Sequence, residues 1–161
     1  MIPENIFENI NSALPIIEKW KAENLKLALT NGCFDLFHKG HVDYLKFSSA
    51  KADRLIVGLN SDISVKKIKG NDRPIQDQLS RATVLSSNMF VDMVILFDDS
   101  TPINLIKAIN PHIIIKGGDY EVEEMIGKDY VNGYGGQILI TPFVEGYSSS
   151  LIIDKIKGLE S

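Results

Sequence analysis

Short apolar runs alternate with amphipathic segments along most of the chain, from residue 25 onward. Runs such as Leu55–Val57 and Ile113–Ile115 are continuous, which is typical of strands covered on both faces. The expected strands span Leu25–Thr30, Arg54–Leu59, Met93–Phe97, Ile113–Lys116 and Gln137–Thr141. The expected helices span His41–Ala52, Gln76–Ser87, Pro102–Ile109 and Ser149–Lys157. This alternation predicts an α/β fold of the Rossmann-like kind, a five-stranded parallel sheet with helices on both faces.

Residues 1–23 follow a different pattern, in which apolar side chains recur at helical spacing. They predict an extra N-terminal amphipathic segment of one or two helices, interrupted near Pro15. Its apolar face must cover either a flank of the same domain or a second subunit, and for this reason we expect a homodimer. Without repeats or a linker, residues 1–161 are expected to form one domain, with 25–158 as its core. The glycine-rich piece Gly127–Gly136 is expected to be loop and turn.

Composition narrows the class of protein. A chain of 161 residues with 44% hydrophobic content can bury a core of its own. The absence of both an apolar run of about 18 residues and a secretion signal predicts no membrane span and no export. A single cysteine fits a reducing compartment, so a cytoplasmic location is expected. The net charge of −4 argues against a nucleic-acid partner.

The candidate chemistry is concentrated in Thr30–Leu45, TNGCFDLFHKGHVDYL. A strand here leads into a glycine-bearing turn with two histidines, His38 and His41, and then into a helix. Such a turn exposes backbone N–H groups, and the start of the helix adds partial positive charge. Both imidazoles could therefore face one anion, which predicts a phosphate-binding site.

This stretch resembles the signature of the His-x-Gly-His nucleotidyltransferase superfamily, which transfers a nucleoside monophosphate from an NTP to a phosphorylated acceptor. The match extends over Gly32-x-Phe34-Asp35-x-x-His38-x-Gly40-His41, between a strand and a helix. Four further segments resemble the heptose 1-phosphate adenylyltransferases within that superfamily: Asn60-Ser61-Asp62, Lys69-Gly70, Arg73-Pro74 and Lys116-Gly117-Gly118-Asp119-Tyr120. The resemblance covers most of the chain.

The resemblance implies roles for individual residues. His38 and His41 would contact the triphosphate and, with Lys69, stabilise charge in the transition state. Arg73 and Arg81 would bind substrate phosphates, although Arg81 could equally be a surface residue of its helix. Apart from the resemblance, the concentration of Lys66, Lys67, Lys69 and Arg73 ahead of Pro74, in a chain of negative net charge, predicts a phosphate-contacting loop. Mg²⁺ would enter with ATP, and the few Cys and His residues predict no separate metal site.

The expected nucleotide-binding residues share a position beyond the carboxyl ends of strands or before the last helix. They are Thr30, Asn31, Gly32, Cys33, Phe34, Asp35, Gly40, Asn60, Lys116, Gly117, Gly118, Asp119, Tyr147, Ser148, Ser149 and Ser150. Asp35 is expected to fix the turn or the ligand and not to act as a base. Cys33 is not expected to be a nucleophile, because this chemistry needs none. One of the three serines could be an ordinary helix cap.

The expected activity is transfer of AMP from ATP to D-glycero-D-manno-heptose 1-phosphate, with a separate sugar kinase supplying that acceptor. The alternative is a cytidylyltransferase that uses CTP with glycerol 3-phosphate or a related phosphate. Enzymes of that kind carry an Arg-Thr-x-Gly-Ile-Ser-Thr signature. Here Gly146-Tyr147-Ser148-Ser149 follows no such arginine, and Tyr147 stands in place of the isoleucine. A non-catalytic nucleotide-binding protein on the same fold is the third interpretation.

Overall fold

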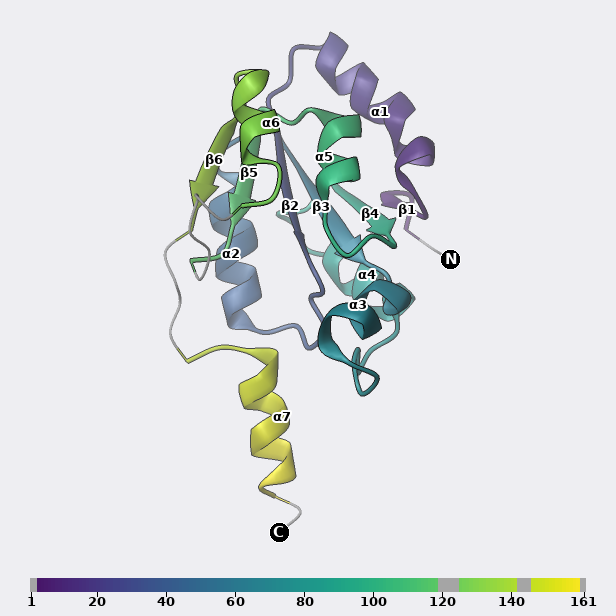
Figure 1. Ribbon diagram of the computed structural model, residues 1–161, viewed down its shortest axis with the longest axis vertical. Helices are drawn as coiled ribbons and strands as arrows, with labels where there is room; N and C mark the ends of the chain where they lie inside the picture. Colours follow the sequence, from purple (N-terminus) through teal and green to yellow (C-terminus); the bar gives the residue numbers. More distant parts are fainter. Residues whose placement is uncertain (1–2, 119–124, 142–145, 160–161) are drawn as a thin grey trace.

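The computed structural model describes residues 3–118, 125–141 and 146–159. In this part of the chain, six parallel strands form one sheet, in the order β1-β4-β3-β2-β5-β6 (Figure 1). The strands are β1 (Ile6–Phe7), β2 (Leu27–Gly32), β3 (Arg54–Asn60), β4 (Met93–Phe97), β5 (Ile113–Lys116) and β6 (Gln137–Ile140). The predicted parallel α/β architecture is confirmed.

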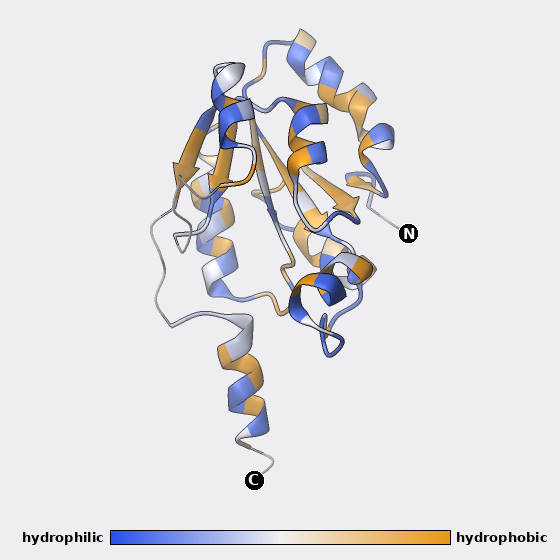
Figure 2. Ribbon diagram, viewed as in Figure 1, coloured by the Kyte–Doolittle hydropathy of each residue, from blue (hydrophilic) through white to orange (hydrophobic). Residues whose placement is uncertain are grey.

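Helices cover both faces of the sheet and bury two separate apolar clusters. The helices are α1 (Ile10–Ala22), α2 (Lys39–Ser49), α3 (Asp62–Lys69), α4 (Gln78–Ser86), α5 (Ile103–Ile109), α6 (Lys128–Gly133) and α7 (Ser149–Lys157). Side chains of α1, α5 and α6 enter one cluster, whereas α2 and α4 contribute to the other. Figure 2 shows β4 and β5 as largely hydrophobic strands, as the apolar runs in the sequence predicted.

The topology of the sheet places a crevice beside β2. The chain passes from β2 through α2 to β3 on one side, and later returns from β4 through α5 to β5 on the other side. In register, Ala28 of β2 lies between Leu55 of β3 and Ile113 of β5. At such a switch point the loops leaving adjacent strands separate, and ligands of open parallel sheets bind there.

Several expected elements are corrected by the structure. The sheet has a sixth strand, β1, because Ile6 and Phe7 pair with β4 and do not begin a helix. Pro15 lies inside α1 without interrupting it, since it faces solvent early in the helix, where the carbonyl left without a donor can be hydrated. The lysine-rich segment expected as loop forms α3, and the glycine-rich segment contains α6.

The apolar face of α1 covers the protein's own sheet. Ala13 and Ile17 are completely buried, in the same cluster as Leu29 and Ile56 of the central strands. Of the two partners considered for that face, a flank of the same domain and a second subunit, the structure shows the first. The reason for expecting a homodimer is therefore removed. No helix among the described residues is long and apolar enough to cross a membrane.

The helix α7 stands apart from the layers described above. It points away from the body of the molecule in Figure 1, and none of its residues is buried. Its apolar side chains include Leu151 and Ile156, each about half exposed. The helix is therefore attached to the domain mainly through its N-terminal end, which reaches the candidate site.

Candidate active site

The carboxyl ends of the central strands open into one cavity of about 740 Å³. Its wall combines segments that follow β2, β3, β4 and β5 with the start of α7. The structure brings together most of the residues predicted from sequence: Asn31, Gly32, Cys33, Phe34, Asp35, His38, Gly40, His41, Asn60, Lys69, Lys116, Gly117, Gly118, Tyr147, Ser148, Ser149 and Ser150. Asp119 lies outside the described residues.

The turn after β2 is held in an unusual backbone conformation. Phe34 has a φ of 44°, in the left-handed region, and its buried ring packs into the core. A Cβ atom at Gly40 would lie only 3.0 Å from His38 Nδ1 and 3.0 Å from Tyr147 Cβ. Glycine at position 40 therefore allows the segment before α7 to lie directly against the histidine turn.

The two histidines lie in contact with each other. Their ring centroids are 3.7 Å apart with an interplanar angle of 21°. The His41 ring is also 5.1 Å from Phe34 and 5.4 Å from Phe37. The backbone N–H of His38 donates to His41 Nδ1 at 3.3 Å. The neutral His41 ring therefore carries its own proton on Nε2.

Burial among these rings keeps His41 uncharged. Desolvation, with contributions from His38 and Lys69, lowers its pKa to about 3. Burial also lowers the pKa of His38 below its ordinary value. Within the described part of the chain, His38 Nδ1 is buried without a hydrogen-bond partner. Near neutral pH the pair is thus a set of hydrogen-bonding groups beside the cavity, and not a pair of cations.

Positive charge at the cavity comes from two lysines on opposite sides of the turn. Lys116 ends β5 and is only 6% exposed, and its ammonium donates to Asn31 Oδ1 at the end of β2. Lys69 ends α3, and its charge acts on both His41 and Cys33. An anion in the cavity would therefore lie between two cations and next to two imidazoles.

The serines before α7 have different partners. Ser148 is the N-cap of α7, since its Oγ accepts from the N–H of Leu151 at 3.1 Å. Ser149 Oγ donates to the carbonyl of Leu36 at 3.3 Å, which ties α7 to the histidine turn. Ser150 is exposed on the cavity wall. Ser148 is therefore the ordinary helix cap that was considered as an alternative. The first residues of α7 nevertheless line the cavity.

Three of the predicted contact residues do not line the cavity: Thr30, Arg73 and Arg81. The Thr30 side chain is fully buried and bonds to the Tyr44 hydroxyl, below the cavity. Arg81 is neither a phosphate ligand nor a surface residue, because its side chain is 0% exposed. Its guanidinium donates to the carbonyls of Cys33 at 2.6 Å and Asn60 at 2.8 Å, which fastens the ends of β2 and β3 together.

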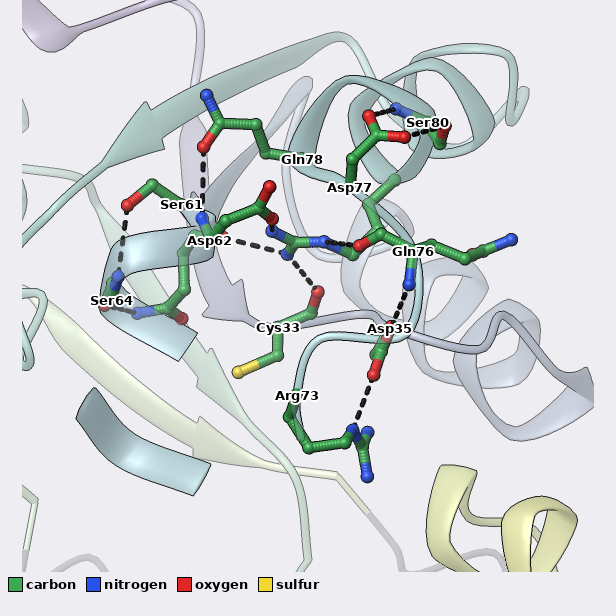
Figure 3. A network of polar contacts seen from close by, with 12 residues as sticks. Cys33, Asp35, Ser61, Asp62, Ser64, Arg73, Gln76, Asp77, Gln78 and Ser80 are labelled. Carbon is green, nitrogen blue, oxygen red and sulfur yellow. Dashed lines mark hydrogen bonds and ion pairs between the residues drawn. The ribbon is translucent and has the colours of Figure 1, made fainter. Parts of the chain in front are cut away.

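Asp35 and Cys33 are unsuited to act as base and nucleophile. Both carboxylate oxygens of Asp35 are occupied by the N–H groups of Ile75 and Gln76 and by Arg73. Figure 3 shows the bonds to Gln76 and Arg73. Burial alone would raise the pKa of Asp35, but these bonds lower it below its usual value. Burial raises the pKa of the Cys33 thiol, although Lys69 and Arg81 oppose the shift. Cys33 is therefore a protonated thiol near neutral pH.

Further residues on the cavity wall were not predicted. Ser100, Thr101 and Pro102 follow β4, so the rule that polar residues collect beyond strand ends could have found them. Thr141 follows β6 and could have been found by the same rule. The others carry no comparable signal in sequence, because their proximity depends on the tertiary fold: Asp43, Tyr44, Phe47, Ile68, Met125 and Ile126. Among the described residues, no group of three or more His, Cys, Asp or Glu could hold a metal ion.

Residues 29–155 match the family model described as cytidylyltransferase-like. Over 143 residues the chain is 50% identical to the bifunctional protein HldE of Caulobacter vibrioides, an alignment that covers 89% of this chain and 30% of that protein. HldE of Geobacter metallireducens is 46% identical over 149 residues, with coverages of 92% and 30%. The crystal structure of the lipopolysaccharide core biosynthesis protein of Thermoplasma volcanium has a TM-score of 0.65 at 28% identity, over 75% of this chain and 99% of that one.

The parallel sheet, with a histidine-bearing cavity at the carboxyl ends of its strands, is the arrangement of a Rossmann-like α/β protein. The chain belongs to the cytidylyltransferase-like family of nucleotidyltransferases. This confirms the recognition of its His-x-Gly-His signature and its resemblance to the heptose 1-phosphate adenylyltransferases. The chain spans about 30% of the length of the HldE relatives.

Proposed function

We propose that this protein transfers AMP from ATP to a sugar 1-phosphate, most specifically D-glycero-D-manno-heptose 1-phosphate, giving ADP-heptose and pyrophosphate. The observation that carries the proposal is the convergence of His38, His41, Lys69 and Lys116 on one cavity. The similarity to HldE proteins and to a lipopolysaccharide core biosynthesis protein supports a sugar phosphate as the acceptor. A separate kinase would supply the sugar 1-phosphate.

The proposed reaction needs neither a covalent intermediate nor a general base. A phosphate oxygen of the acceptor, already anionic near neutral pH, attacks the α-phosphorus of ATP. The new P–O bond forms as the bond to the β-phosphate oxygen breaks, and pyrophosphate leaves. His41 donates from Nε2–H to a phosphate oxygen, and Lys69 and Lys116 offset the developing negative charge. Mg²⁺ enters as part of the ATP substrate and neutralises phosphate charge.

The two substrates are proposed to occupy opposite ends of the cavity. Gly117 and Gly118 follow β5, where glycines leave room for a base or ribose beside the backbone, and the serines line the cavity at the start of α7. The β4 side carries the hydroxyls of Ser100 and Thr101, with Lys69 at its border. Hydroxyls together with a cation suit a phosphorylated, polyhydroxylated acceptor.

The test is pyrophosphate release in Mg²⁺, with ATP, CTP, GTP and UTP crossed against D-glycero-D-manno-heptose 1-phosphate and glycerol 3-phosphate. Release only with ATP and the heptose phosphate is the expected result. Release with CTP and glycerol 3-phosphate would replace the proposal with the cytidylyltransferase alternative. If no combination reacts although ATP binds in a calorimetric titration, the non-catalytic interpretation holds for these acceptors.

A further inference from the structure

The two lysines that line the cavity differ in how far they are enclosed. Lys116 ends β5 and is only 6% exposed, whereas Lys69 ends α3 and is exposed. A buried ammonium loses most of its hydration and requires oxygen acceptors close to it. The place of the Lys116 charge in the cavity therefore depends on the acceptors that the surrounding strands present.

Asn31 on the neighbouring strand is such an acceptor. Its Oδ1 accepts a hydrogen bond from Lys116 Nζ, and both residues line the cavity. The strands β2 and β5 are adjacent and parallel (Figure 1), so this bond joins the carboxyl ends of the two strands. An amide oxygen holds the ammonium without neutralising it, and the positive charge stays available to an anion.

The strand on the other side of β2 leaves room for this contact. Gly58 of β3 is the residue in register with Asn31. A Cβ atom at position 58 would lie 3.3 Å from Asn31 Cβ and 2.5 Å from Leu105 Cδ2. Because glycine occupies this position, no side chain of β3 presses on the Asn31 amide from that side.

The backbone that carries the pair is fastened one residue earlier on each strand. The hydroxyl of Tyr44 bonds to the Thr30 side chain and donates to the carbonyl of Ile115 at 2.8 Å. Thr30 precedes Asn31, and Ile115 precedes Lys116. One side chain of α2 thus ties both strands together, and the Asn31 amide is presented to Lys116 from a fixed point.

We propose that Asn31 is a positioning residue, which acts on the reaction by holding the Lys116 ammonium at the carboxyl ends of β2 and β5. This role rests on the proposed nucleotidyl transfer, in which Lys116 offsets the negative charge that develops on the phosphates. It differs from the direct nucleotide contact that was expected of Asn31 from sequence.

The kinetic test is a double-mutant cycle between Asn31→Ala and Lys116→Met, read as kcat/KM for ATP. Loss of one oriented donor to a developing charge costs about 100- to 1,000-fold, which is the loss expected of Lys116→Met. A displaced catalytic group costs about 100-fold, which is the loss expected of Asn31→Ala. In the Lys116→Met background, Asn31→Ala should cost little more. Losses that multiply fully would show that Asn31 acts independently of Lys116, and would overturn the proposal.

A second measurement needs no nucleotide. The acetylation of each lysine by acetic anhydride is followed as a function of pH by mass spectrometry of peptides. Only the uncharged amine reacts, and a hydrogen-bond acceptor favours the ammonium. Asn31→Ala should therefore move the acetylation profile of Lys116 to lower pH, by about one pH unit. Asn31→Asp keeps the acceptor oxygen and adds negative charge, so it should move the profile to higher pH.

The matched control is Asn60→Ala. Asn60 is likewise an amide at the carboxyl end of a central strand and on the cavity wall, but its Nδ2 donates to Ser64 Oγ at 2.9 Å. The acetylation profile of Lys116 should stay in place in this variant, as should that of Lys69 in Asn31→Ala. A shift of the Lys116 profile equal to that in Asn31→Ala would mean that removing any amide from the wall affects Lys116, and the specific role of Asn31 would be rejected.

The two measurements separate this proposal from the proposed function. If the wild-type protein transfers no nucleotide but the Lys116 profile moves in opposite directions in the two Asn31 variants, the proposed function fails and the holding of Lys116 by Asn31 stands. If Asn31→Ala does not fold, Asn31→Asp is taken through both measurements. A Lys116 profile identical to that of the wild-type protein in a folded Asn31 variant would overturn the positioning role.

Discussion

At the scale of single residues, the central finding is that His41 is a neutral hydrogen-bond donor. Three rings surround it, and its Nδ1 accepts from the backbone of His38. A protonated histidine would be repelled by Lys69 and would lose solvation. Near neutral pH the positive charge beside the cavity therefore belongs to the lysines and not to His41, whose Nε2–H is the group proposed to donate to a phosphate oxygen.

Replacing His41 by alanine should reduce kcat by about 100- to 1,000-fold, the range found when one oriented donor to a developing negative charge is removed. The fold should survive, because the ring is partly exposed and lies at the edge of the apolar cluster. Steady-state kinetics and circular dichroism measure both effects. His112→Gln serves as the control, since His112 lies at the opposite edge of the sheet. Near-normal kcat in folded His41→Ala would contradict the assigned role.

The low pKa of His41 also predicts how stability depends on pH. In the unfolded chain His41 titrates near 6.5, whereas in the folded protein its pKa is about 3. Between these values only the unfolded state takes up this proton, so stability falls as pH falls. The contribution from this one group is about 1.4 kcal/mol per pH unit. Asp35, whose pKa is also lowered, adds a loss of the same sign only below its ordinary value of 3.8.

The measurement is the free energy of unfolding in urea at a series of pH values between 6.5 and 4.5. The wild-type protein should lose stability faster than His41→Gln as pH falls, by close to the slope given above for one proton. Parallel curves for the two proteins would show that His41 has an ordinary pKa in the folded state.

At the scale of secondary structure elements, the sequence predicted the strands better than the connections. The strands β3, β4 and β5 lie within a residue of their expected bounds, because buried apolar runs have few other interpretations. The helix α3 was missed because Lys66, Lys67 and Lys69 were interpreted as a charged loop. Its start does carry a signal, since Ser61 accepts from the N–H of Ser64 as an N-cap.

The site could be predicted to the extent that it follows strand ends. Lys116 and Asn60 were found in this way, and both lie on the cavity wall. The role of Arg81 could not be predicted, because it depends on carbonyls that are 48 and 21 residues away in sequence. For the same reason, no local sequence pattern indicates the hydrogen bonds between residues 73–76 and Asp35, which join positions 38 to 41 residues apart.

Replacing the N-cap serines of α3 and α7 by alanine should have different effects on the free energy of unfolding. Ser61 caps α3, which buries Ser64 and Val65, whereas Ser148 caps α7, which buries none of its residues. Ser61→Ala should therefore lower the free energy of unfolding by about 1 kcal/mol. Ser148→Ala should leave that free energy unchanged and reduce only the helical signal of α7. Urea unfolding followed by Trp20 fluorescence, together with far-UV circular dichroism, distinguishes these results; equal losses would contradict the prediction.

At the scale of the whole molecule, the cavity lies at the carboxyl end of β2, the strand from which the strand order continues to β3 on one side and to β5 on the other. Its walls come from segments on both sides of β2, and Arg81 and Asp35 connect the turn after β2 to segments that follow β3. The helix α1 contributes to stability on the far flank, and none of its residues lines the cavity. This contribution to stability and the proposed chemistry thus lie in different regions of the chain.

The exposed position of α7 has a practical consequence for handling the protein. A helix that buries no residues opens easily, and Lys155 and Lys157 lie within it. Trypsin should therefore cut there first and leave the remaining domain intact, as mass spectrometry would show. Because Ser148 and Ser150 face the cavity, bound ATP should slow this cut and leave slower cuts elsewhere unchanged. Equal rates with and without ATP would show that the nucleotide does not engage α7, whereas protection would report occupancy without any acceptor.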